Sequence, residues 1–135
     1  MLQRLPSWMR SSSSLLFLLF LLTLSLSAWQ SKHYTGTWKS NGAGGGGKFD
    51  INLGTSEADS RVSFAIGSSE LKTTVKSFKA DGNNFEIAYE FDVAGNRLTS
   101  TVKGKREGTK LEASYRTTVT GSDEQVDNGT LTASE

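Results

Sequence analysis

The feature that most constrains this chain is a strict alternation of apolar and polar residues over residues 85–102. Apolar side chains occupy every second position from Phe85 to Val93, and after an interruption at residues 94–96 the alternation resumes at Leu98. Successive side chains of a strand point to opposite faces of the sheet, so a period of two is typical of a half-buried strand. Two such runs around a short Gly-Asn segment predict an antiparallel hairpin.

The same alternation recurs along most of the chain. Residues 34–40, 48–54, 61–68, 110–120 and 129–134 show it, whereas residues 72–79 place Val75 and Phe78 on opposite parities, which predicts a β-bulge there. With about eight short strands and no helical periodicity after residue 28, we predict an all-β fold. A single antiparallel meander closing into a small barrel is favoured because closure removes exposed edges, and a two-sheet β-sandwich is the alternative.

The first 28 residues carry the pattern of a secretory signal peptide. Arg4 and Arg10 precede an apolar run over residues 15–26, and small residues follow it, so cleavage is expected after Ser27 or Ala28. The run is shorter than the roughly 17–25 residues that a membrane-spanning helix needs. We therefore expect residues 29–135 to form one secreted or periplasmic domain that has no membrane association after cleavage.

The composition argues against several classes of function. The chain has no cysteine, a single histidine, His33, and a net charge of +1. Thiolate zinc sites, cysteine nucleophiles and disulfides are excluded, and the mixed charges lack the basic face that nucleic-acid binding needs. We expect no cofactor, no metal ion and no nucleic-acid partner.

A glycine-rich stretch over residues 42–47 matches dinucleotide-binding and phosphate-loop templates only in its glycines. The position after Lys48, where a phosphate loop has Ser or Thr, is occupied by Phe49, which opens an alternating strand and not a helix. The stretch therefore predicts a flexible hairpin loop.

Three carboxylates on the central hairpin resemble a catalytic cluster at first sight. Glu86, Glu90 and Asp92 have the parity opposite to the aromatic residues, so they are expected on the solvent face, opposite Arg97 and Lys103 or Lys105 of the next strand. This predicts a cross-strand charge ladder. No serine has a candidate base beside it, and we expect a protein that is not an enzyme.

Aromatic and hydroxyl side chains gather on the predicted inner face. One interpretation is ordinary core packing, and the other is that the small barrel keeps part of its interior open for a small apolar ligand. The candidate interior ligand-binding residues are Tyr34, Trp38, Phe64, Tyr89, Phe91, Ser100, Tyr115 and Thr117.

Two short motifs frame the predicted domain. Gly36-Thr37-Trp38 lies in the first strand and Gly129-Thr130-Leu131-Thr132-Ala133 in the last. With these motifs the chain resembles the lipocalin-like, or calycin, small antiparallel barrels, and is similar to uncharacterised secreted bacterial β-modules with a Gly-Thr-Trp start. The resemblance implies a barrel in which Trp38 plugs one end.

Three functions remain open at this point. The first is a secreted binding module that holds a small apolar ligand in the barrel interior. The second, implied by the resemblance, is a protease inhibitor that acts on a secreted protein partner through its N-terminal arm, residues 28–34. The third is a structural β-module without a small ligand. The sequence leaves the oligomeric state open, and also whether the sequon at Asn128 is glycosylated.

Overall fold

The computed structural model describes residues 29–42 and 44–135, so the predicted signal peptide lies outside the described residues. Ser31–Glu135 form one compact unit. The secondary structure assigned to the described residues consists of strands without a helix, and none of their segments is therefore a helix able to cross a membrane.

Nine strands follow one another in the described part of the chain, one more than the sequence predicts. The additional strand is β4, a short segment that folds back on β3 through a turn at Gly67, whose φ of 61° lies in the left-handed region. The strands are β1 (Lys32–Ser40), β2 (Gly46–Leu53), β3 (Arg61–Ile66), β4 (Ser69–Lys72), β5 (Thr74–Asp81), β6 (Asn84–Val93), β7 (Asn96–Glu107), β8 (Lys110–Val119) and β9 (Gln125–Ser134).

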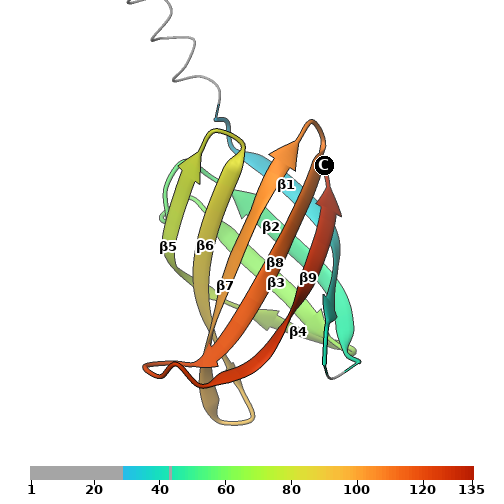
Figure 1. Ribbon diagram of the computed structural model, residues 1–135, viewed down its shortest axis with the longest axis vertical. Helices are drawn as coiled ribbons and strands as arrows, with labels where there is room; N and C mark the ends of the chain where they lie inside the picture. Colours follow the sequence, from blue (N-terminus) through green and yellow to red (C-terminus); the bar gives the residue numbers. More distant parts are fainter. Residues whose placement is uncertain (1–28, 43) are drawn as a thin grey trace, which may run out of the picture. The chain divides into compact units, whose positions relative to one another are not determined.

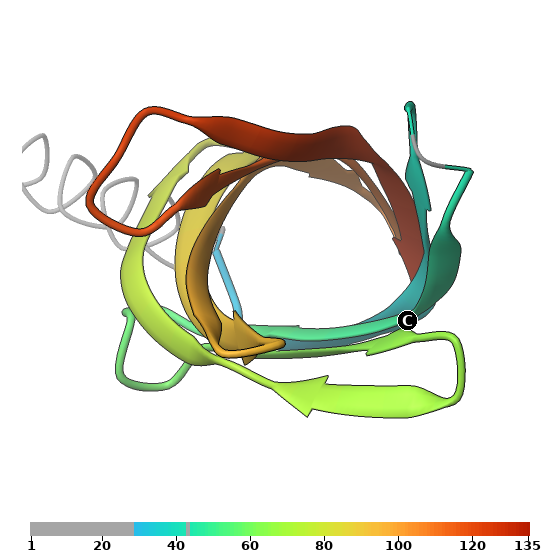
Figure 2. The same ribbon diagram turned by 90° about the horizontal axis from the view of Figure 1, so that it is seen from below.

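All nine strands belong to one antiparallel sheet in the order β4-β3-β2-β1-β9-β8-β7-β6-β5. The first strand therefore pairs with the last, and the sheet curls into an open half-barrel whose edges are β4 and β5 (Figures 1 and 2). This confirms the predicted all-β antiparallel fold and excludes the two-sheet sandwich. The architecture is compatible with a lipocalin-like barrel.

The irregular segment predicted around residues 72–79 marks the place where the sheet opens. Thr73 separates β4 from β5, which are consecutive in the chain but form opposite edges of the sheet. The pairing of β5 with β6 shifts register between Val75 and Ser77. The bulge moves Phe78 onto the face that Val75 occupies, since one extra residue switches the face that follows. Val75 then lies opposite Tyr89, and Phe78 opposite Ile87.

The connections between strands follow local turn chemistry. In the β6–β7 turn, Ala94 and Gly95 both have positive φ, 51° and 81°, as a two-residue primed hairpin requires. The β2–β3 loop is organised by the carboxylate of Asp59, which accepts hydrogen bonds from the backbone N–H and hydroxyl groups of Thr55 and Ser56. These bonds hold the pKa of Asp59 well below its usual range.

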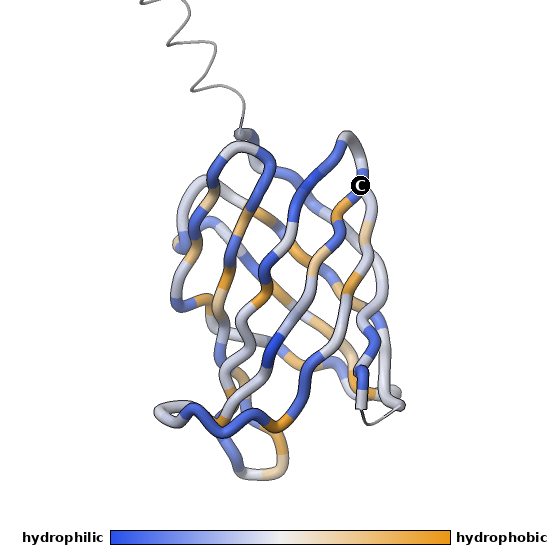
Figure 3. Tube along the Cα trace, in the orientation of Figure 1, coloured by the Kyte–Doolittle hydropathy of each residue, from blue (hydrophilic) through white to orange (hydrophobic). Residues whose placement is uncertain are grey.

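The core lies inside the curl of the sheet, because the apolar positions of every strand share the inward parity. Figure 3 shows hydrophobic and hydrophilic residues alternating along the strands. Fifteen apolar residues are buried among the described residues, and five polar ones join them. The buried polar residues are Ser40, Ser60, Ser100, Arg106 and Thr117.

The two ends of the interior differ in their side chains. The end bordered by the β1–β2, β3–β4, β6–β7 and β8–β9 connections, the lower end in Figure 1, is called the mouth below. The opposite part, called the far half, contains aliphatic residues that are at most 1% exposed. These far-half residues are Ile51, Leu53, Ile87, Val102 and Leu111.

Candidate functional site

A cavity of about 160 Å³ opens at the mouth. It is lined by inward-facing side chains from β1, β2, β3, β6, β7, β8 and β9, and most of them are apolar. Ile66 and Val126 stand at its rim and are 42% and 49% exposed. The other lining residues are Trp38, Phe49, Phe64, Tyr89, Phe91, Val93, Leu98, Ser100, Tyr115, Thr117 and Asp127.

Seven of the eight residues that the sequence singles out for the interior meet around this cavity. The exception is Tyr34, which is fully buried, pairs across to Ile51 and does not line the cavity. Its hydroxyl is the one buried side-chain polar atom without a hydrogen-bond partner in the described residues. Tyr34 therefore belongs to the packed interior beyond the cavity.

Trp38 occupies the mouth because the facing strand gives it space. Its cross-strand partner is Gly47, and a Cβ at Gly47 would collide with the backbone carbonyl of Ala65 and lie 3.1 Å from the indole Nε1. The indole passes over this glycine and donates a hydrogen bond from Nε1 to the carbonyl oxygen of Ala65, 2.8 Å away. The end of the glycine-rich stretch thus positions the tryptophan, and Gly44, with φ 69°, serves the loop before it.

The aromatic rings of the mouth meet mostly edge to face. Trp38 is nearly perpendicular to Phe64 and to Tyr115, with centroid distances of 6.2 and 6.0 Å, and Phe64 is nearly perpendicular to Phe91 at 4.9 Å. Edge-to-face pairs are favourable because the positive ring edge meets the negative ring face. Rigid rings packed in this way leave the residual space that forms the cavity.

Three hydroxyl groups form a polar cluster in this apolar wall. Ser100 and Thr117 face each other across β7 and β8 with their oxygens 2.5 Å apart, and Tyr89 is hydrogen-bonded with Ser100. Burial raises the pKa of Tyr89, and the hydrogen bond with Ser100 offsets part of that rise.

Asp127 is the second polar site in the cavity wall. Its Oδ1 accepts a hydrogen bond from the Ser40 hydroxyl at 2.6 Å, and its Oδ2 accepts one from the Tyr115 hydroxyl at 2.8 Å. Burial and the bond to this carboxylate both raise the pKa of Tyr115, so the phenol keeps its proton. The two bonds join β1, β8 and β9 at the mouth and hold the carboxylate at the edge of the cavity.

Asp127 is a cavity-lining residue that the sequence analysis misses. The expected last strand begins at residue 129, whereas β9 begins at Gln125. Extending the alternation backwards from Leu131 and Gly129 places Asp127 on the inner face, and that signal is present in the sequence. The acidic residues Asp123 and Glu124 just before β9 make the segment resemble a loop, whereas Asp127 pairs with Thr117 in the regular part of the β8–β9 ladder.

The carboxylates of the central hairpin lie outside the barrel, as predicted. Arg97 contacts Asp92 at 3.1 Å and Glu90 at 3.4 Å, while Glu86 lies opposite Lys103 in the register of β6 and β7. The bonds to Asp92 and the charge of Glu90 raise the pKa of Arg97. The charge ladder is therefore an outer-surface feature that pins the register.

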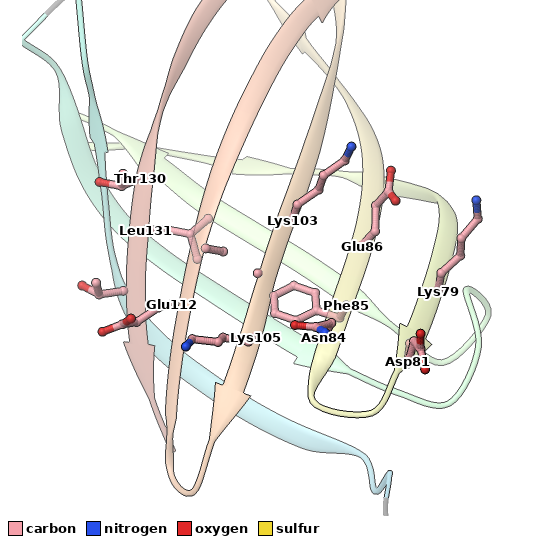
Figure 4. Close-up of a pocket in the computed structure, with 14 residues that line it drawn as sticks. Lys79, Asp81, Asn84, Phe85, Glu86, Lys103, Lys105, Glu112, Thr130 and Leu131 are labelled. Carbon is pink, nitrogen blue, oxygen red and sulfur yellow. The ribbon is translucent and has the colours of Figure 1, made fainter.

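A groove crosses the outer face from β5 to β9. Its floor is the backbone of the inward-pointing row Phe85, Gly104, Ala113 and Leu131, and side chains of the neighbouring outward rows form its banks. Figure 4 shows Lys103, Glu86 and Lys79 side by side along one bank. The groove carries three cationic and three anionic side chains, so its charge favours neither anionic nor cationic ligands. The charged residues are Lys79, Asp81, Glu86, Lys103, Lys105 and Glu112.

The remaining sequence features are placed on the outer surface. His33 is exposed and its Nε2 lies 2.6 Å from Oδ1 of Asp50, and Asn128 of the sequon is exposed on β9. No group of three or more metal-ligating side chains occurs in residues 29–42 and 44–135. Of the predicted N-terminal arm, residues 32–34 are paired with β2, and residue 28 lies outside the described residues.

The cavity at the mouth is thus mostly apolar and aromatic, with a cluster of hydroxyl groups and one carboxylate in its wall. Such a lining encloses a small apolar body and fixes its orientation through a few polar contacts. No family model, curated protein or solved structure matches the chain.

Proposed function

We propose that the protein is a secreted binding module that holds a small, largely apolar ligand in the mouth cavity. The observation that carries this proposal is the convergence of seven inward residues on one cavity, with polar groups at two points of an otherwise apolar wall. The pattern of residues 1–28 supports export. The curled antiparallel sheet and the Gly-Thr-Trp start support a lipocalin-like ancestry.

The size of the cavity limits the ligand. Ordinary small-molecule pockets measure about 300–1,000 Å³, whereas an apolar cavity of about 150 Å³ admits a molecule the size of benzene. At about 160 Å³ the mouth accepts one ring or a compact branched group. A longer ligand would extend past Ile66 and Val126 into solvent, since both rim residues are exposed.

The experiment is a titration of the purified protein with toluene and phenol as single-ring probes. The indole N–H resonance of Trp38 is the reporter, because Trp38 lines the cavity and its N–H is held by the hydrogen bond to Ala65. We expect saturable shifts of this signal. The replacement Ile66→Trp, which adds a ring at the rim, should weaken binding by about tenfold or more, consistent with the loss of roughly one ring's burial.

The matched control is Ser63→Trp, which adds the same ring to β3 at an outward position. It should leave the titration unchanged. A Trp38 signal that responds neither to these rings nor to a cationic probe of similar size, in a protein shown to be folded, would contradict the proposal and favour the structural β-module. Equal loss of binding in both variants would show that the probes bind elsewhere.

A further inference from the structure

The mouth cavity has a single charged side chain in its lining. Asp127 is that residue, and no lysine, arginine or histidine is among the lining residues. The outer surface differs, because there the acidic residues face basic ones, as Glu86 faces Lys103. A ligand in the mouth therefore meets one negative charge without a compensating positive charge in the cavity wall.

The carboxylate is held in place with part of its accepting capacity unused. Ser40 donates to Oδ1 and Tyr115 donates to Oδ2, one hydrogen bond to each oxygen. An ionised carboxylate offers about four acceptor sites, so roughly two remain. Both donors are neutral hydroxyl groups, and they fix the orientation of the carboxylate without neutralising it.

Aromatic rings stand beside this charge. Tyr115, which binds Asp127, packs edge to face with Trp38 at a centroid distance of 6.0 Å, and Trp38 packs with Phe64 at 6.2 Å. Ring faces attract cations within about 6 Å, and tryptophan and tyrosine do so most strongly. A carboxylate next to aromatic rings is a combination that recognises an organic cation.

Resting on the proposed binding function, we propose that the ligand carries a substituted ammonium group that enters the mouth beside Asp127. The carboxylate of Asp127 repels an anionic ligand, and it adds no electrostatic attraction for a neutral ring. A primary ammonium is strongly hydrated and loses that hydration in a largely apolar wall. A quaternary ammonium spreads its charge over methyl groups, which suit both the apolar wall and the rings.

The test compares choline with 3,3-dimethylbutan-1-ol, which has the same shape without the charge. Both are titrated at constant ionic strength against the full protein, with the Trp38 indole signal and calorimetry as readouts. We expect choline to bind about tenfold more tightly than its neutral isostere, the difference typical of a cation–π contact with a nearby carboxylate.

Three variants locate the effect. Asp127→Asn should remove the preference for choline, and Asp123→Asn, which removes the same charge from the β8–β9 loop, should keep it. Because Asp127 also joins three strands, Val126→Lys serves as a second variant. It places a cation at the exposed rim without touching the bonds of Asp127, and it should lower the affinity for choline but not for the isostere.

Equal affinities for choline and its isostere would overturn the ammonium proposal and leave the binding function standing. Retention of the preference in Asp127→Asn, in a protein that unfolds cooperatively, would overturn it as well. If choline and the isostere both fail to bind while toluene or phenol binds, the ligand is neutral and the ammonium proposal is wrong. Failure of all four probes would remove the binding function itself.

Discussion

The mouth and the far half of the barrel are built from the same alternating strands, yet they have different interiors. In the far half, Ile51, Ile87 and Leu111 are at most 1% exposed. At the mouth, rings such as Trp38 and Phe64 meet edge to face around an open space. Alternation assigns a side chain to the inside of the barrel, but the shape of that side chain determines whether the inside fills.

Branched aliphatic side chains fill space because they adopt rotamers that interdigitate at the density of organic crystals. Flat rings are rigid, and those of the mouth also have polar partners to satisfy, as Trp38 does with Ala65 and Tyr115 with Asp127. The hydrogen bonds fix ring positions that close packing alone would not select. The closely packed aliphatic core therefore lies in the far half, and the open space lies at the mouth.

The largest expected difference comes from truncating the same residue type in the two regions. Leu111→Ala, in the far half, should lower the free energy of unfolding by about 2–5 kcal/mol, because it leaves a cavity in packed surroundings. Leu98→Ala, at the mouth, should cost clearly less, since Leu98 is only half-buried and already borders open space. Urea unfolding measures both, and equal losses would show that the mouth is as tightly packed as the far half.

The second effect concerns the glycine beneath Trp38. Gly47→Ala should cost about 1–3 kcal/mol, the usual penalty of overpacking, because the added methyl group collides with the Ala65 carbonyl and displaces the indole. Thermal unfolding measures the loss, and a change in the fluorescence of Trp38 shows its location. The control is Gly42→Ala, where a Cβ meets nothing within 4 Å. If Gly47→Ala changes neither the thermal stability nor the fluorescence, the indole of Trp38 does not pack over Gly47 as the structure shows.

The third effect is a loss of stability at high pH that originates at the mouth. Burial raises the pKa of Tyr89 and of Tyr115 above the ordinary value of 10.0, so both tyrosines lose their protons more readily in the unfolded state than in the folded state. Their contribution is complete below pH 10 and is lost as the pH rises through the pKa values of the folded state. Ultraviolet absorbance of a Tyr34→Phe variant should show no tyrosinate at pH 10 while it is folded, and about half-ionised tyrosines in urea.

Ionisation of either tyrosine near pH 10 in the folded variant would contradict the buried mouth described above. The same variant tests the far half, because the hydroxyl of Tyr34 has no hydrogen-bond partner. Removing an unpaired buried hydroxyl should leave stability unchanged or slightly higher. Destabilisation by Tyr34→Phe would indicate that this hydroxyl is bonded in solution.

The smallest effect lies in the β2–β3 loop, which follows the far-half residue Leu53. Asp59→Ala should lower the melting temperature slightly, because Thr55 and Ser56 lose the acceptor of their backbone N–H groups. The folded-state pKa of Asp59 is depressed, so this contribution is present above the unfolded pKa of about 3.9 and is lost as the pH falls below it. Melting curves at pH 7 and pH 2 measure the loss. An equal difference between Asp59→Ala and the parent at both pH values would contradict this account.

The sequence by itself determined the fold class, the inward face of most strands and most of the residues around the cavity. It could do so because side-chain direction in a strand depends only on position along that strand, and the turns at residues 94–96 and 108 are encoded locally by glycines. The placement of Glu86, Glu90 and Asp92 on the outside followed from the same rule.

Only the tertiary structure decided how far along the barrel each inward residue lies. Tyr34 and Trp38 share one strand face, but the register with β2 and β9 puts Trp38 at the mouth and Tyr34 in the packed interior. Asp127 joins the site because β9 begins at Gln125 and pairs Asp127 with Thr117, which also lines the cavity. Register is a property of pairs of strands, and a single strand's sequence does not contain it.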